Sequence, residues 1–282
     1  MIKNLLTRSL TSILILLIFG GITLASFFNG IFELTISLVA MMCIYEAVNA
    51  IGFSKNKRFL IPCILYAFFV PLSFCLVDKL HKSPYYAIII LTFLFLISFI
   101  VMAMLNFDFL KFNDAATIMF VSLVITCFLS NIILLRRIEN HGLFYMILVI
   151  VCFSWATDIF AYLVGICIGK HKFSPKISPK KTIEGSLGGV FFSILITIIA
   201  LLIYKNITNC SINFPLAVLY ALLCSFVGQI GDLSFSYIKR SYDIKDFGNL
   251  LPGHGGVLDR LDSLIFISPF FYMLITFSSF IV

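Results

Sequence analysis

Apolar residues in this chain form long uninterrupted runs, and most charged residues lie in the short segments between them. A helix needs about 20 mostly apolar residues to cross the hydrocarbon core of a bilayer, whereas the strands of a membrane barrel are alternating segments of about ten residues. The pattern therefore predicts an all-α polytopic integral membrane protein. Nine runs fit such helices, at roughly residues 10–28, 31–52, 59–77, 86–105, 115–135, 142–167, 186–204, 214–236 and 264–282.

Composition and charge agree with a membrane protein and set its expected orientation. Of the 282 residues, 61% are hydrophobic and 12% are charged, whereas a soluble domain is about 45–50% apolar and about 25% charged. With a cytoplasmic N-terminus, fifteen of the 20 Lys and Arg residues fall on the cytoplasmic side, as the positive-inside rule requires. We therefore expect a multi-pass protein of the inner (cytoplasmic) membrane, with its N-terminus and active site cytoplasmic. The eight Cys have no paired spacing, so neither a zinc site nor a disulfide framework is expected.

The polar residues divide the chain into two regions. Residues 1–141 hold five predicted spans with little chemistry, which suits a scaffold or a route of lipid access. Glu33 and Glu46 are exceptions, because carboxylates in apolar helices are costly and are often functional. The simpler explanation for each is a position near a helix end or a hydrogen bond to a neighbour. Residues 142–282 contain most of the polar motifs and are the expected catalytic region.

A basic segment follows the sixth run, which itself contains Asp158. Its five lysines between residues 170 and 181 suit a positive-inside anchor or a surface for anionic lipid headgroups. Ser178-Pro179 resembles a helix start, with Ser as the cap and Pro in the first helical position. The first turn of that helix, where free backbone N–H groups favour phosphate, would then hold Lys180, Lys181 and Thr182. Glycines at 185, 188 and 189 would allow a close approach of another helix or backbone.

The last loop contains the second group of polar residues. If the end of the eighth run is helical, Asp232, Ser236 and Lys239 lie on one face. Asp259 and Asp262 are three residues apart and would also share a face. Hard cations such as Mg²⁺ prefer oxygen ligands, usually one or two carboxylates completed by substrate phosphates. Asp232 and Asp259 are the expected carboxylate pair, and nearby Lys and Arg would balance phosphoryl charge.

These residues resemble the signature of the phosphatidate cytidylyltransferase family, also called CDP-diacylglycerol synthases. The signature positions filled here are Ser236, Lys239, Arg240, Lys245, Asp246, Pro252, His254, Gly255, Gly256, Asp259, Arg260 and Asp262. The segments Asp158–Tyr162 and Ser178–Gly185 also resemble this family, so the likeness covers about residues 150–270. One departure is Phe235, because family members often carry Glu at this position. The metal assignment therefore rests on Asp232 and Asp259 alone.

The resemblance implies a reaction and a set of residue roles. The phosphate of phosphatidic acid would attack the α-phosphorus of CTP, giving CDP-diacylglycerol and pyrophosphate. Mg²⁺ is the implied cofactor, held by Asp232 and Asp259, with K⁺ as a candidate second cation. Lys239 joins these two aspartates as the third implied catalytic residue. The implied substrate-binding residues are Ser178, Lys180, Lys181, Thr182, Glu184, Ser236, Arg240, Lys245, Asp246, His254, Arg260 and Asp262.

One lipid substrate and one water-soluble substrate require an amphipathic, cytoplasm-facing polar cavity at membrane depth. Asp158 and Asp232 would face this cavity rather than lipid, since polar groups at that depth need a wet lining. The expected partners are CTP, phosphatidic acid and the bilayer, with a homodimer as a candidate assembly and no nucleic acid. Three alternatives remain at this stage: a coupled carrier or channel, a lipid or polyprenol kinase, and a cytidylyltransferase for another lipid phosphate.

Overall fold

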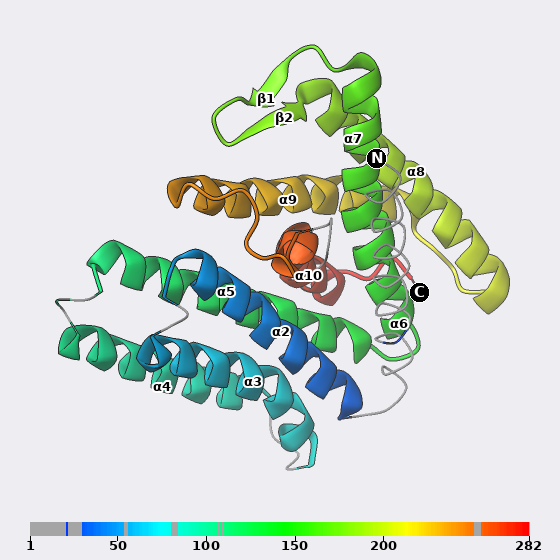
Figure 1. Cartoon of the computed structure of the whole chain (residues 1–282). Helices are drawn as coiled ribbons and strands as arrows, with labels where there is room; N and C mark the ends of the chain where they lie inside the picture. Colours follow the sequence, from blue (N-terminus) through cyan, green and yellow to red (C-terminus); the bar gives the residue numbers. More distant parts are fainter. Residues whose placement is uncertain are drawn as a thin grey trace. The chain divides into compact units, whose positions relative to one another are not determined.

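The computed structural model describes residues 21, 30–53, 56–79, 84–106, 108, 110–250 and 255–281. Within them, eight helices are long and apolar enough to cross a membrane, which confirms the all-α polytopic fold (Figure 1). The first predicted span, 10–28, lies outside the described residues apart from residue 21. The eight spans are α2 (Ile31–Ala50), α3 (Lys57–Lys79), α4 (Pro84–Leu105), α5 (Phe112–Arg136), the continuous run of α6 (Gly142–Ile147), η1 (Leu148–Trp155) and α7 (Ala156–Ile168), α8 (Ile183–Thr208), α9 (Phe214–Ser241) and α10 (Leu258–Phe277).

The chain forms two compact units, and the division does not follow the order of the sequence. The first unit comprises the chain up to Ile133 together with Tyr242–Leu261. The second comprises Leu134–Ser241 and Asp262–Val282. Helix α10 therefore begins in the first unit and continues in the second. The predicted division at residue 141 concerns function rather than compactness and stays a prediction.

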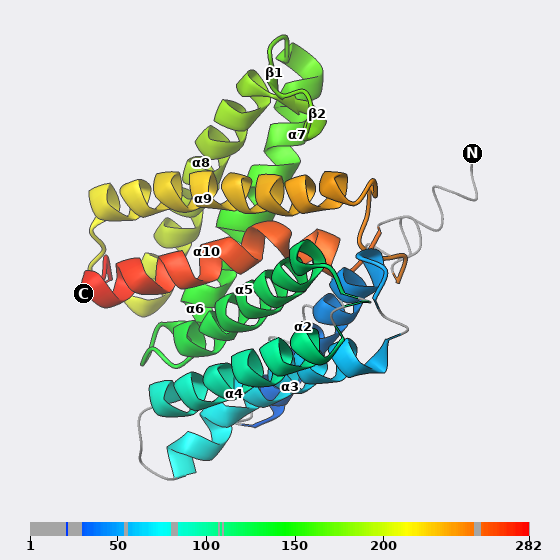
Figure 2. The same cartoon turned by 90° about the vertical axis from the view of Figure 1, so that its left-hand side faces the viewer.

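The first unit is built around α2, α3, α4 and α5. Helix α3 packs against both α2 and α4, as Figure 2 shows for the blue to green helices. A polar contact ties α3 to α5, because the hydroxyl of Tyr66 lies 3.0 Å from the sulfur of Cys127. Helix α2 begins after Gly30, whose backbone N–H donates to the Glu33 carboxylate at 2.8 Å. Glu33 therefore caps its own helix, one of the two simpler explanations for its place in an apolar run.

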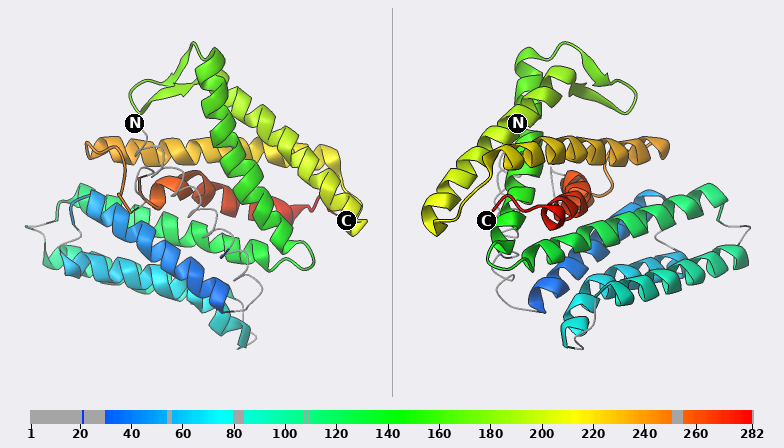
Figure 3. Two further views of the ribbon diagram at one scale, coloured as in Figure 1. Left: turned by 45° about the vertical axis from the view of Figure 1, so that its right-hand side comes forward. Right: turned by 180° about the vertical axis from the view of Figure 1, so that it is seen from behind.

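The second unit places α8 against both α7 and α9, and Figure 3 shows these helices from two sides. The contact of α8 with α7 is close because α8 presents glycines there. A Cβ added at Gly189 would lie 2.6 Å from the carbonyl oxygen of Thr157, and one at Gly185 would lie 2.5 Å from that of Ala161. Small residues let membrane helices approach to backbone contact. The predicted close approach at these glycines is confirmed.

A β-hairpin replaces the helix start predicted at Ser178-Pro179, and that prediction was wrong. Strand β1 (Lys172–Ser174) pairs antiparallel with β2 (Ser178–Thr182). Helix α8 begins only at Ile183, where Thr182 is the cap and its hydroxyl accepts the N–H of Gly185 at 3.1 Å. Proline fixes φ near −65°, which is compatible with extended backbone as well as with a first helical turn. Lys180 and Lys181 are therefore strand residues.

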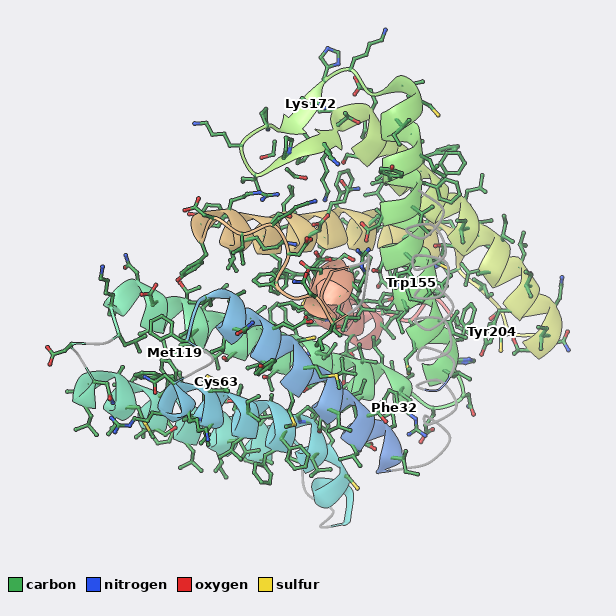
Figure 4. The ribbon with its side chains drawn as sticks, in the orientation of Figure 1. Phe32, Cys63, Met119, Trp155, Lys172 and Tyr204 are labelled. Carbon is green, nitrogen blue, oxygen red and sulfur yellow. The ribbon has the colours of Figure 1, made fainter. Side chains whose placement is uncertain are left out.

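The sixth span contains a π-helical segment, η1, which ends at Trp155 (labelled in Figure 4). It lies directly before the segment that contains Asp158. Short π-helical stretches are rare and are frequent at functional sites. The last span also differs from expectation, because α10 begins at Leu258 rather than near residue 264. Asp259 and Asp262 therefore lie in its first two turns, which confirms that they share a helix.

Candidate active site

Three of the predicted site residues lie near the C-terminal end of α9, in the second unit. The helix extends unbroken to Ser241, so Asp232, Ser236 and Lys239 share one face, as expected from their spacing. The hydroxyl of Ser236 donates to Oδ1 of Asp232 at 3.3 Å. Lys181 from β2 forms an ion pair with Oδ2 of the same carboxylate. Strand and helix thus bring together two residues that lie 51 positions apart.

The ammonium group of Lys181 is poorly satisfied by the protein. Its nitrogen is shielded from solvent, and among the described residues it has no hydrogen-bond acceptor beyond its ion-pair partner Asp232. An ammonium group has three N–H donors, and burying donors without acceptors is costly. An anion bound beside Lys181 would supply the missing acceptors.

Within the second unit, Asp158 accepts a hydrogen bond from one serine, which is itself hydrogen-bonded to another. The hydroxyl of Ser263 donates to Oδ2 of Asp158 at 3.2 Å and lies 2.7 Å from the hydroxyl of Ser154. Ser154 belongs to the π-helical segment, and both serines are buried. These hydrogen bonds explain how a carboxylate is accommodated inside an apolar span. The expectation that Asp158 faces a substrate cavity stays a prediction.

Two further charged residues are buried near Asp232. The exposed fractions of Asp262 and Lys239 are 6% and 8%. Asp262 interacts electrostatically with Asp232, Asp158 and Lys239. Phe235 lies on the buried side of α9, where its ring packs edge-on against Phe266 with 6.1 Å between the ring centroids. We call the charged residues the Asp232 cluster: Asp158, Lys181, Asp232, Lys239 and Asp262.

Four other signature residues, Asp246, Gly255, Gly256 and Asp259, form a second group, in the first unit. Oδ2 of Asp259 accepts two backbone hydrogen bonds, from Phe247 at 2.9 Å and from Gly256 at 3.0 Å. Asp246 lies beside the same turn, since a Cβ at Gly255 would be 3.5 Å from its Oδ1. We call Asp246, Phe247, Gly255, Gly256 and Asp259 the Asp259 loop. The Asp259 carboxylate, which the sequence analysis predicts to be a metal ligand, therefore holds the backbone of this loop.

The segment that leads into the Asp259 loop is anchored on α5. The hydroxyl of Tyr242 donates to Oδ1 of Asp114 at 3.1 Å. Burial raises the pKa of Tyr242, so the phenol stays protonated and keeps donating at neutral pH.

The donor atoms suit Mg²⁺, but they do not enclose it. No group of three or more His, Cys, Asp or Glu side chains that could hold a metal ion occurs in the part of the chain that the structure describes. Mg²⁺ commonly uses only one or two protein carboxylates and completes its shell with water and substrate phosphates. Asp232 and Asp259 belong to different units. Their sharing of one ion therefore stays a prediction.

The other predicted substrate-binding residues have varied surroundings. Glu184 accepts hydrogen bonds from the backbone N–H groups of Lys170 and His171 and pairs with the His171 ring, which ties the hairpin to α8. Nε of Arg240 donates to the carbonyl of Ile177 at 3.3 Å, which ties the hairpin to α9. Ser178 is half-buried in β2, and His254 lies outside the described residues. The exposed residues are Lys180, Arg240, Lys245, Asp246 and Arg260.

The contacts of three residues were not predicted from the sequence. Ser263 is hydrogen-bonded to Asp158 and Ser154 to Ser263, but buried serines are too common in helices to signal this role. Glu46 is the third, and both of its carboxylate oxygens accept backbone hydrogen bonds from the start of α10. The position of the Glu46 carboxylate within an apolar run did indicate a special role. Its partners lie more than 200 residues away, beyond what helical spacing can indicate.

Known proteins similar to this chain point to a single chemistry. The model of the cytidylyltransferase family matches residues 6–278. The phosphatidate cytidylyltransferase of Bacillus subtilis (strain 168) is 36% identical over 218 residues, which cover 77% of each chain. Phosphatidate cytidylyltransferases of Staphylococcus aureus (strain COL) and Staphylococcus haemolyticus are 35% and 33% identical, each over 95% of this chain and 98% of the relative.

Proposed function

This chain belongs to the cytidylyltransferase family, and from that premise we propose that it transfers the cytidylyl group of CTP to phosphatidic acid. The products are CDP-diacylglycerol and pyrophosphate, so the enzyme acts in phospholipid synthesis. All three relatives named above are phosphatidate cytidylyltransferases, and the match covers 98% of the two staphylococcal ones, which supports the same substrates here. The eight apolar helices in the described part of the chain fit a multi-pass membrane protein whose lipid substrate arrives from the bilayer.

The observation that carries this function is the ion pair of Lys181 and Asp232, two half-buried side chains. The ammonium nitrogen is shielded from water and has donors left for a ligand. Lys239, on the same helix face as Asp232, is also buried. Cations fixed in a site of low solvent exposure stabilise the charge that develops on a reacting phosphoryl group. We assign Lys181 and Lys239 to the phosphates of the substrates.

The reaction needs positioning and charge neutralisation more than covalent help. A phosphate oxygen of phosphatidic acid forms a bond to the α-phosphorus of CTP. The bond from that phosphorus to the oxygen bridging to the β-phosphate breaks, and its electron pair leaves with pyrophosphate. No side chain has to remove a proton, because a phosphate monoester is largely ionised near neutral pH. The role of the protein residues is to hold the two phosphates in line and to balance their charge.

We propose Mg²⁺ as the cofactor, with Asp232 and Asp259 as its carboxylate ligands and K⁺ as a candidate second cation. A bound divalent ion would neutralise charge on the transferring phosphoryl group. The carboxylate oxygens of these two residues are the hard ligands that such an ion prefers. Removal of divalent cations with EDTA should stop turnover, and added Mg²⁺ should restore it. Full activity in EDTA would contradict a divalent cofactor.

We further propose that the hairpin and the Asp232 cluster face the cytoplasm, where CTP is available. The excess of Lys and Arg on that side supports this orientation. The polar cavity, the assignment of the exposed signature residues to substrate contacts and a homodimeric state stay predictions. The mass of the purified protein in detergent would test the last of these.

The test of the site compares two lysines of the same hairpin. Lys181→Met removes the buried ammonium but keeps much of the side-chain volume, so turnover should fall by about 10²–10³-fold, the usual cost of one charge-stabilising donor. Lys172→Met is the matched control, because Lys172 is exposed on β1 (labelled in Figure 4) and its change should leave turnover within about twofold, as for most surface substitutions. Equal activity of the two variants would remove Lys181 from the site.

A further inference from the structure

Glu46 lies in the fifth turn of α2, in the region expected to serve as a scaffold, yet its partners belong to the signature segment. Its exposed fraction is 2%. Oε1 accepts the backbone N–H of Val257 at 3.0 Å, and Oε2 accepts that of Leu258 at 2.9 Å. Leu258 is the first residue of α10. One carboxylate from α2 thus satisfies two of the N–H groups that a helix leaves free at its start.

The loop backbone packs closely around the Glu46 carboxylate at two glycines. A Cβ added at Gly256 would lie 2.5 Å from Oε2 of Glu46, and one at Gly248 would lie 2.4 Å from Oε1. Such distances are shorter than any van der Waals contact. Glycine at both positions therefore allows the loop to close around the carboxylate from two sides.

Glu46 and Asp259 together use three consecutive backbone donors. The N–H of Gly256 donates to Asp259, and those of Val257 and Leu258 donate to Glu46. Negative charge at a helix start is favoured by the helix dipole as well as by the hydrogen bonds. The start of α10 is thus occupied by the protein's own carboxylates. The donors that most often bind phosphate at a helix start are already taken here.

We propose that Glu46 is a positioning residue for cytidylyl transfer. It fixes the first turn of α10 and thereby the place of Asp259 and of the Asp259 loop. Glu46 itself contacts neither substrate, and helix α2 contributes to the reaction through it. The proposal rests on the assignment of the signature loop to the active site.

Glu33 supplies a matched control on the same helix. It is as buried as Glu46, with an exposed fraction of 1%, and it also accepts a backbone N–H, that of Gly30. Gly30, however, is the residue directly before α2. Replacing Glu33 therefore tests the cost of losing a buried carboxylate from α2 without touching the start of α10.

The experiment compares Glu46→Gln with Glu33→Gln in the full-length protein in detergent. Glutamine keeps the size of glutamate but places an NH₂ donor against one of the two backbone N–H groups. Hydrogen exchange at Gly256, Val257 and Leu258 should accelerate by about tenfold or more in Glu46→Gln, since local opening sets these rates. The turnover number should fall by about 10²-fold, as for a small misplacement of reacting groups, while the KM for CTP changes by less than about threefold. Glu33→Gln should keep both the exchange at these amides and turnover near the wild-type values.

Three outcomes would overturn the proposal: normal exchange at the α10 start in Glu46→Gln, full turnover despite accelerated exchange, or equal effects in the two variants. Glu46→Asp adds a graded test, because the shorter side chain keeps the charge but cannot reach both amides. Its turnover should lie between those of the wild type and Glu46→Gln. The exchange measurement needs no substrate, so it tests the cap even if the wild-type protein failed to use phosphatidic acid.

Discussion

Asp259 accepts two backbone hydrogen bonds through a single carboxylate oxygen, from Phe247 and from Gly256. The side chain therefore has a local role that needs only an acceptor, besides the proposed metal role that needs negative charge. Asn can keep the acceptor oxygen in the same place while removing the charge. Asp259→Asn thus separates the two roles at one residue.

We expect Asp259→Asn to reduce turnover by at least about 10²-fold, the scale at which fixed charge contributes in phosphoryl chemistry. The melting temperature in detergent should stay within a few degrees of wild type, because the loop keeps its hydrogen bonds. Asp243→Asn is the control, since Asp243 is an exposed residue just beyond α9. Full turnover by Asp259→Asn over a range of Mg²⁺ concentrations would contradict the metal role. Asp259 would then serve only to hold its loop through the two backbone hydrogen bonds.

At the level of elements, eight of the nine predicted spans could be located from hydropathy alone, with most ends within about five residues. The membrane makes this possible, because every spanning helix must be long, apolar and internally hydrogen-bonded. The spacing of Asp232, Ser236 and Lys239 likewise predicted their shared face, because helical periodicity relates positions four and seven apart. These predictions depend on local sequence only.

The errors at this level arise where local signals are ambiguous or where partners are distant. Ser178-Pro179 is compatible with both a helix start and an extended strand. The segment is a strand because it pairs with Lys172–Ser174. The pairing of Lys181 with Asp232 depends on that hairpin, so periodicity could not predict it. The same holds for Glu46, whose backbone partners at the start of α10 are set by tertiary structure.

At the level of the whole molecule, α8 offers a direct test of orientation. It has 26 residues and is therefore about 39 Å long, enough to cross a hydrocarbon core of about 30 Å. The hairpin with Lys172 precedes its first residue, and Asn206 is exposed in its last turn. Cysteines at these two positions should therefore lie on opposite sides of the membrane.

We expect the thiol of Asn206→Cys to react with a membrane-impermeant maleimide in intact spheroplasts. That of Lys172→Cys should react only after permeabilisation. The background variant lacks the four native thiols that are not buried, those of Cys75, Cys127, Cys167 and Cys210. The reverse labelling pattern would place the Asp232 cluster outside and would contradict a site that uses cytoplasmic CTP.

The most direct test of the proposed reaction follows the phosphorus atoms of CTP. Purified protein receives phosphatidic acid, Mg²⁺ and CTP labelled with ³²P at either the α- or the γ-position. Cytidylyl transfer predicts that the α-label enters the lipid fraction and that the γ-label leaves as pyrophosphate. Entry of the γ-label into lipid would reveal a kinase, and the absence of both labels from lipid in folded protein would contradict the account.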